Sequence, residues 1–246
     1  GKRWGSGRLK VHDTLAQQGE GSRLAAFVAS LYGFAIPMTV LLLLLHNGLD
    51  LARKMRGPRA RRHRLEEAPL SPSERWQHAA NAVCFLLLAY SGFALHDPLA
   101  WWALPFQLLG GEAARRNAHR AAAALFLMTA AAHLAYLNTQ KGRARLRSML
   151  PAWRDLQDPV KVLAYNAGVS SDKPALAQFC YVEKFEYWAL VWGSFIMTMT
   201  GGLLLFHNLA LAWLPLWLTE TARVIHYLEA VLACLAILLW HGYWVF

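Results

Sequence analysis

Histidine is the residue type in this chain whose numbers and spacing suggest chemistry. Ten histidines occur in 246 residues, and eight of them lie inside or at the ends of long apolar segments. The other two, His12 and His63, stand in polar, basic surroundings and are predicted to lie at a surface. An ionisable side chain at membrane depth is costly and is a functional candidate. Neutral imidazole is a good iron ligand, so the buried histidines predict an iron-containing cofactor.

The spacing of four histidines predicts two stacked binding positions. His119 and His133 are 14 residues apart, about 21 Å along a helix and on nearly the same face. His226 and His241 are 15 residues apart, about 22 Å, but an ideal helix rotates them by roughly 60°. Imidazoles that face each other at two depths can clamp two haem irons in a dry bundle core. The alternative, in which each histidine hydrogen-bonds to a neighbouring carbonyl, stays open.

Other cofactor chemistries are not supported. Cys84, Cys180 and Cys234 form no CxxC or CxxCH motif, so no disulfide framework, zinc knuckle or c-type haem attachment is expected. The chain also shows no GxGxxG fingerprint and no P-loop, which leaves nicotinamide and nucleotide chemistry without a motif.

Histidines at membrane depth imply helices that cross a bilayer, and the composition predicts five such helices. Hydrophobic residues make up 56% of the chain and charged residues only 16%, against about 25% in soluble domains. Apolar runs at 24–45, 76–95, 187–206 and 224–246 are each long enough to span a bilayer, and an Ala-rich segment at 119–137 is the fifth. We therefore expect an all-α integral membrane protein. Its four-helix haem-binding core, 76–246, follows an extra helix at 24–46 that is kinked at Pro37.

The basic residues predict the orientation of these helices. Sixteen lysines and arginines lie in the segments 47–75 and 139–184, whereas the opposite connections hold Arg115, Arg116, Arg120 and Arg223. The positive-inside rule then places the two basic segments in the cytoplasm, the tail 1–23 in the periplasm and the C-terminus inside. The tail is interpreted as a remnant of a longer N-terminal region. The net charge of +10 thus reflects topology and does not indicate nucleic-acid binding.

Alternating helix directions sort the histidines by depth. His119 and His226 lie on the outer side, and His96 and His207 are predicted to be interfacial caps there. The inner, cytoplasmic side holds the remaining four, namely His46, His78, His133 and His241. In the long basic segment, 144–156 either lies in the membrane interface or is a solvated loop, and 165–168 is predicted to turn.

At these residues the sequence resembles the di-haem cytochrome b (gamma) subunits of membrane formate dehydrogenases, with related hydrogenase and thiosulfate-reductase subunits. The matching core helices are ERWQHAANAVCFLLLAYSGFAL, HRAAAALFL, FEYWALVWGSFIMTMTGGLLLF and RVIHYLEAVLACLAILLWHGYWVF, and YNAG resembles a cytoplasmic loop motif. The resemblance covers about residues 74–246. It is nearest to the branch found with multihaem c-type cytochromes.

The resemblance implies a set of site residues. Two b-type haems are expected, the inner one held by His78 and His241 and the outer one by His119 and His226. Arg75 would pair with a haem propionate. A menaquinone or ubiquinone site is implied on the cytoplasmic side near His241, where Asn166 would hydrogen-bond a quinone carbonyl and Gly168 would let the backbone approach it.

The resemblance also implies a function. The chain would be an electron-transfer subunit of a quinone-linked complex in the bacterial inner membrane, not a self-sufficient enzyme. It would pass electrons between the quinone and a periplasmic multihaem c-type cytochrome or iron–sulfur subunit. The alternative is a non-redox membrane scaffold or transporter with protonatable histidines, although no internal repeat or broken polar helix favours a transporter.

Three features depart from the family pattern. The helix at 24–46 is additional, and the His226–His241 spacing is one residue longer than expected, which predicts a π-bulge or a tilted ligand. His133 is an extra inner histidine that could replace His78 as the partner of His241, or bind a third haem with His46. The His78–His241 pair is the first choice.

One carboxylate also needs an explanation. Glu229 follows His226 by one turn in an otherwise apolar helix. It would hydrogen-bond a ligand histidine, contact a haem, carry protons or snorkel to the outer interface.

Overall fold

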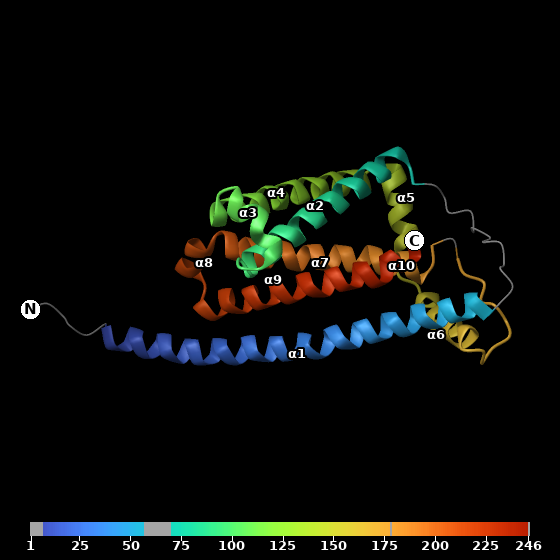
Figure 1. Cartoon of the computed structure of the whole chain (residues 1–246), viewed down its shortest axis with the longest axis horizontal. Coiled ribbons are helices and arrows are strands. Elements are labelled where there is room, and N and C mark those ends of the chain that lie inside the picture. Colours follow the sequence, from blue (N-terminus) through green and yellow to red (C-terminus); the bar gives the residue numbers. More distant parts are fainter. Residues whose placement is uncertain (1–6, 57–69, 178, 246) are drawn as a thin grey trace, which may run out of the picture. The chain divides into compact units, whose positions relative to one another are not determined.

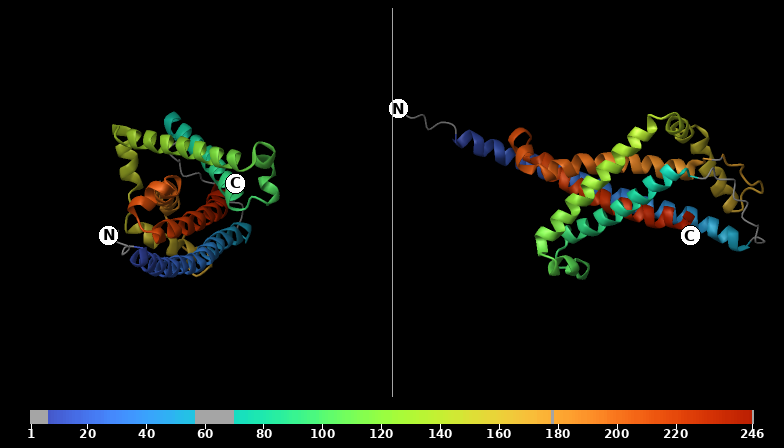
Figure 2. Two further views of the ribbon diagram at one scale, coloured as in Figure 1. Left: turned by 90° about the vertical axis from the view of Figure 1, so that its left-hand side faces the viewer. Right: turned by 90° about the horizontal axis from the view of Figure 1, so that it is seen from above.

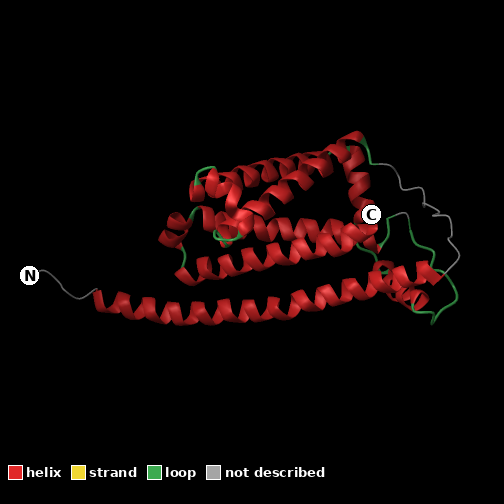
Figure 3. Ribbon diagram, viewed as in Figure 1, coloured by secondary structure: helices red, strands yellow, loops and turns green. Residues whose placement is uncertain are grey.

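A computed structural model of the chain describes residues 7–56, 70–177 and 179–245, with side chains from Arg23 onwards. Within these ranges every regular element is helical and no strand occurs (Figure 3). Five helices are long and apolar enough to cross a membrane, at Arg23–Arg56, Pro72–His96, Gly111–Leu137, Tyr181–Leu205 and Leu216–Val245. The predicted all-α integral membrane fold with five spans is confirmed, and the chain is a multi-pass membrane protein.

The described chain divides into two compact units. The α2 unit contains α2 (Pro72–His96), η1 (Trp101–Ala103), α3 (Leu104–Leu108), α4 (Gly111–Leu137) and α5 (Gln140–Met149). The α1 unit contains α1 (Gly7–Arg56), most of α6 (Arg154–Asn166), α7 (Tyr181–Leu205), α8 (His207–Trp213), α9 (Leu216–Ala236), the π-turn η2 (Ile237–His241) and α10 (Gly242–Val245). Figure 1 labels these elements.

In the α2 unit, a ladder of polar contacts fixes α2 against α4. The pairs are Glu74 with Tyr136 (3.0 Å), Gln77 with His133 (2.8 Å), Asn81 with Thr129 (2.7 Å) and Ser91 with His119 (3.0 Å). The residue numbers rise along α2 by the same steps by which they fall along α4. The two helices are therefore antiparallel in one register over their whole shared length.

In the α1 unit, polar contacts join α1 to the C-terminal helix. The Tyr32 hydroxyl donates to Glu229 Oε2 at 2.7 Å, and the Tyr243 hydroxyl donates to Asp50 Oδ2 at 2.6 Å. Because the residue numbers rise together, α1 runs parallel to α9, and the views in Figures 1 and 2 show the two helices side by side. α7 also packs against α9 and runs antiparallel to it.

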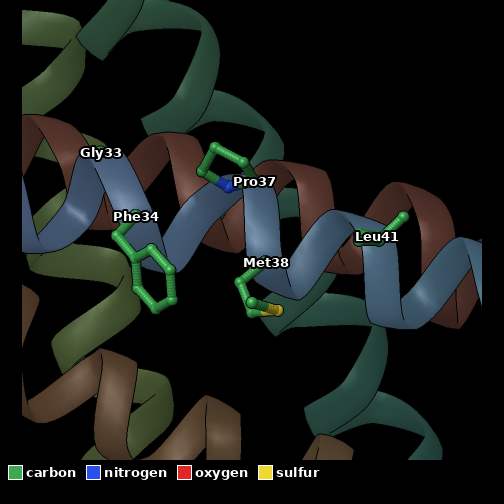
Figure 4. A pocket seen from close by; sticks show the side chains of 5 residues that line it. All are labelled: Gly33, Phe34, Pro37, Met38 and Leu41. Carbon is green, nitrogen blue, oxygen red and sulfur yellow. The ribbon is translucent and has the colours of Figure 1, made fainter.

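The exposed face of α1 is apolar along the predicted span. Gly33, Phe34, Pro37, Met38 and Leu41 line a shallow depression on it (Figure 4). Phe34 and Leu41 are 66% and 61% exposed, which suits a surface covered by lipid. The helix runs unbroken through Pro37, as membrane helices tolerate proline.

The structure corrects several predicted boundaries. α1 begins at Gly7 and ends at Arg56, so 7–23 and 47–56, which were expected to flank the helix, are helical as well, while the candidate span itself begins at Arg23. Its last turn carries Arg53, Lys54 and Arg56, which interact favourably with the negative end of the helix dipole. Of the basic loop expected at 47–75, the part 57–69, including His63, lies outside the described residues.

The core helices also begin earlier than the apolar runs. α2 begins at Pro72, because Ser71 forms a capping box with Glu74 and the proline occupies the first turn. α4, α7 and α9 begin at Gly111, Tyr181 and Leu216. The short helices η1, α3 and α8 fill connections for which no element was predicted.

Residues 144–156, in the basic segment after α4, are helical at both ends. α5 is held on α2 by two hydrogen bonds from Arg145 to the Glu74 carboxylate, at 2.7 and 3.0 Å, and the Arg145 guanidinium lies 4.8 Å from the Phe179 ring centre. The segment 144–156 therefore forms the end of α5 and the start of α6, with a break near Pro151.

The turn between α4 and α5 predicts a sensitive glycine. A Cβ on Gly142 would stand 2.1 Å from the Tyr136 carbonyl oxygen, so Gly142→Ala must move backbone and should cost about 1–3 kcal/mol. We expect a lower melting temperature for the detergent-purified protein. Gly48→Ala is the control, since nothing lies within 4 Å of its Cβ position. Equal melting temperatures for the two variants would contradict the prediction.

Candidate haem-binding site

His119 on α4 is oriented by a hydroxyl whose proton is used elsewhere. Ser91 Oγ lies 3.0 Å from His119 Nδ1 and donates to the Leu87 carbonyl at 2.6 Å. A hydroxyl has one proton, so its oxygen accepts from Nδ1–H. We therefore assign the neutral tautomer in which Nδ1 carries the proton and Nε2 carries the lone pair.

His226 on α9 is oriented in the same way. Thr200 Oγ1 lies 2.9 Å from His226 Nδ1 and donates to the Ile196 carbonyl at 2.7 Å. The threonine oxygen again accepts from Nδ1–H, and the lone pair again falls on Nε2. The two outer histidines thus have the same protonation and the same kind of partner, each within its own unit.

A glycine follows each of these hydroxyl residues. A Cβ on Gly92 would come within 3.2 Å of His119 Cε1, and a Cβ on Gly201 would come equally close to His226 Cε1. That distance is tighter than ordinary van der Waals contact, so each imidazole occupies space that only glycine leaves. We call Ser91–Gly92 and Thr200–Gly201 ring seats, because each pair supplies a hydrogen-bond acceptor and space for one imidazole ring.

His133 on α4 and His241 on η2 are also held by acceptors on the partner helices. His133 Nδ1 lies 2.8 Å from Gln77 Oε1, and His241 Nδ1 lies 3.2 Å from both carboxylate oxygens of Glu186. A carboxylate only accepts, so Nδ1 donates, and in a neutral imidazole the lone pair then falls on Nε2. Gln77 donates its amide nitrogen to Ser73 Oγ at 3.1 Å, which leaves Oε1 for His133.

The two helix pairs consequently share one arrangement. Gln77 and Ser91 are 14 residues apart on α2, and their partners His133 and His119 are also 14 apart on α4. Glu186 and Thr200 are 14 apart on α7, whereas their partners His241 and His226 are 15 apart. The extra residue is the only difference in spacing between these two sets of contacts.

The π-turn η2 accommodates this extra residue. It covers Ile237–His241, and the Gly242 amide donates to the Ile237 carbonyl five residues back. The predicted π-bulge is confirmed. An effective spacing of 14 residues in an α-helix leaves His226 and His241 roughly 40° apart, as for His119 and His133. The turn thereby directs His241 to Glu186 on the same side as His226 meets Thr200.

His78 has a different position from the other candidates. It follows Gln77, so it points about 100° away from the stripe of α2 that contacts α4. It belongs to the α2 unit and His241 to the α1 unit, as do His119 and His226 respectively. Each haem pair implied by the resemblance takes one histidine from each unit, and both pairings stay predictions.

The candidates for a third haem and for caps are partly explained by local contacts. His46 is buried, its Nε2 lies 2.7 Å from the Tyr181 hydroxyl and its Nδ1 lies 3.4 Å from Asn47 Oδ1. Iron ligation by His46 would require Nε2 to exchange the tyrosine for the metal. His96 ends α2 and His207 begins α8, which fits their predicted places at helix ends.

The residues expected near a propionate or a quinone have other local partners. Arg75 Nε donates to the Leu70 carbonyl at 3.0 Å. Asn166 is buried and donates to Asp50 Oδ1 at 3.4 Å. These contacts neither assign nor remove the roles implied by the resemblance.

Gly168 is explained by the end of α6. Its φ is +80°, and hydrogen bonds run from Gly168 N to the Tyr165 carbonyl and from Val169 N to the Ala164 carbonyl. This is a Schellman C-cap, which favours glycine at its left-handed position. The predicted turn at 165–168 is correct only for 167–168, since 165 and 166 are the last residues of α6, and the cap is sufficient reason for a glycine at 168.

Glu229 is buried against α1 and does not snorkel. It is 8% exposed, its Oε2 accepts from Tyr32, and a Cβ on Gly193 would lie 3.5 Å from its Oε1. Tyr32 was not recognised from the sequence, where it is one aromatic residue in an apolar run. Only the unusual carboxylate signalled that a partner was needed.

The adjacent glycines of α7 provide a matched test of the ring seat. Gly201→Ala must displace the His226 ring by a few tenths of an ångström, and we expect haem retention to fall roughly tenfold. In Gly202→Ala nothing lies within 4 Å of the added Cβ, and haem content should match the unmodified protein. Haem per protein after purification checks this. Equal retention in both variants would show that His226 needs no such seat.

No disulfide joins Cys84, Cys180 and Cys234. Among the described residues, no group of three or more His, Cys, Asp or Glu could hold a metal ion by itself.

Comparison with known families identifies the core of the chain. Residues 70–246 match the model of the prokaryotic cytochrome b561 family, which leaves α1 outside the match. No curated protein and no solved structure gives a match. The match covers well over half of the sequence and includes His119, His133, His226 and His241. The chain therefore belongs to the prokaryotic cytochrome b561 family of membrane proteins that bind b-type haem.

Proposed function

We propose that the protein carries electrons across the membrane through two b-type haems. The observation that supports this is the shared orientation of four histidines, His119, His133, His226 and His241, each of which donates from Nδ1 and presents its lone pair on Nε2. A transporter or scaffold with protonatable histidines has no need for this uniform tautomer. Haem, when bound, supplies reversible one-electron chemistry in a low-dielectric core.

Four histidines are the proposed iron ligands. His78 and His241 would hold the inner haem, and His119 and His226 would hold the outer haem, as the resemblance to formate dehydrogenase gamma subunits implies. Ser91, Thr200 and Glu186 fix the rings of three of these ligands and raise their basicity through the Nδ1 hydrogen bonds. Arg75, whose Nε donates to the Leu70 carbonyl, would pair with a propionate through its terminal nitrogens.

A second ligand scheme is favoured by a specific observation. His133 repeats, on α4, the place that His241 occupies on its own helix, with a side-chain acceptor at Nδ1 and 14 residues to the outer ligand. In that scheme His133 replaces His78 as the partner of His241. A third haem held by His133 and His46 is the minority scheme, because His46 Nε2 is already bonded to Tyr181.

Orientation and partners complete the proposal. The positive-inside rule places the N-terminus in the periplasm and α5 in the cytoplasm, with Arg143, Arg145 and Arg147. A menaquinone or ubiquinone would bind on the cytoplasmic side near His241, Asn166 and Gly168. The outer haem would exchange electrons with a periplasmic multihaem c-type cytochrome or iron–sulfur subunit of a hetero-oligomeric complex.

Spectroscopy of the purified protein tests the proposal. Dithionite-reduced minus oxidised spectra should show b-type haem bands, and haem analysis should give two haems per chain. Folded protein with no haem would favour the non-redox alternative.

Single histidine variants separate the ligand schemes. We expect His78→Ala to lose one haem because it removes an axial ligand of the inner iron, while His133→Ala keeps both. Haem stoichiometry and the remaining low-spin signal measure this. Loss of a haem from His133→Ala but not from His78→Ala would establish the second scheme.

The Thr200 hydroxyl should tune the outer haem. Thr200→Val keeps the shape of the side chain but removes the acceptor for His226 Nδ1–H, so the ligand becomes less electron-rich and the ferric state less stable. We expect the midpoint potential of one haem to rise by roughly 60 mV, which corresponds to a tenfold change for one electron. Thr200→Ser should restore the original potential. A redox titration that finds Val and Ser identical would contradict the role of the hydroxyl.

A further inference from the structure

The π-turn that carries His241 receives a hydrogen bond from the additional helix α1. Asn47 Nδ2 donates to the Leu239 carbonyl at 2.7 Å, and Leu239 is the middle residue of η2. Asn47 is only 7% exposed. A π-turn interrupts the regular ladder of backbone hydrogen bonds, so a side-chain donor inserted there stabilises the wider turn.

The neighbouring side chains enclose this hydrogen bond. His46 lies 4.9 Å from the Trp240 ring, centre to centre, and 2.7 Å from the hydroxyl of Tyr181, the first residue of α7. His46, Trp240 and Tyr181 are all buried. The donor is thus held in place by packing and excluded from competing solvent.

The extra residue and the extra helix are related by this contact. The turn exists because His226 and His241 are separated by one residue more than Thr200 and Glu186, their partners on α7. The donor to the turn comes from α1, which lies outside the family match at 70–246. A regular helix of the same length would rotate His241 by about 100° away from Glu186.

The geometry points to Asn47 as a positioning residue for His241: α1 stabilises the π-turn that aims this ligand at the inner iron. The inference rests on the proposed function in one respect, namely that His241 is an iron ligand. Asn47 Nδ2 bonds the backbone of η2, through which its effect on His241 passes, while its Oδ1 lies 3.4 Å from His46 Nδ1.

The test is Asn47→Leu in the full-length, haem-loaded protein. Leucine has a similar volume and no donor, so the π-turn loses its external hydrogen bond. We expect the g values of the low-spin EPR signal of the inner haem to shift, and its retention on dilution to fall roughly tenfold. Unchanged EPR signals and retention would overturn the inference.

Tyr32→Phe is the matched control for general loosening of α1. It removes the hydrogen bond from α1 to Glu229 of α9, far from the π-turn. We expect it to leave the inner-haem signal and retention as in the unmodified protein. If Tyr32→Phe changes them as much as Asn47→Leu does, the effect is docking of α1 and the positioning role is wrong.

Deleting one residue of the π-turn provides an independent test. Leu238 is 70% exposed, so its deletion removes little packing while restoring a spacing that a regular α-helix can hold. In this background Asn47→Leu should change the inner-haem signal much less. An equal effect with and without Leu238 would overturn the inference.

His241→Ala distinguishes failure of the inference from failure of the proposed function. Loss of the inner haem in this variant upholds the ligand assignment, and the Asn47 results then decide the inference alone. If His241→Ala keeps both haems, the ligand assignment is wrong and the inference falls with it.

Discussion

The hydrogen bond at Nδ1 of each core histidine is the interaction on which the site depends. In an apolar core an imidazole N–H needs an acceptor, and the choice of acceptor decides which nitrogen carries the lone pair. Ser91 and Thr200 can only accept at this point, because each hydroxyl donates to a carbonyl of its own helix. Helix spacing, the adjacent glycines and the antiparallel registers all serve to bring these groups together.

That requirement turns the length of the chain between two ligands into a physical constraint. α7 holds Thr200 and Glu186 at a fixed separation. His226 on α9 and His241 on η2 must therefore point in directions that match these two partners. One additional residue would misdirect the second histidine by more than a quarter turn in a regular helix. The π-turn is therefore the local irregularity that keeps both hydrogen bonds.

The sequence predicts the parts of this design that are local. The five spans follow from apolar runs, and the π-bulge was one of two alternatives suggested by a His226–His241 spacing one residue longer than the resembled family has. The start of α2 was missed although Ser71 and Glu74 show the spacing of a capping box, whereas α4 and α9 begin without a side-chain cap. The shared arrangement of the two helix pairs was missed because it consists of contacts between helices and repeats few residue types.

Contacts to α1 were equally invisible, and they show what a fifth helix can contribute. Lipid is as apolar as leucine, so helix association in a membrane depends on close packing and polar contacts. Tyr32 and Asn47 direct such contacts at the C-terminal segment, beside Glu229 and inside the turn before His241. A helix that only anchored the chain would need no buried polar side chains. The polar groups of α1 instead act on the segment that carries two of the proposed ligands, so α1 is best understood as part of the ligand scaffold.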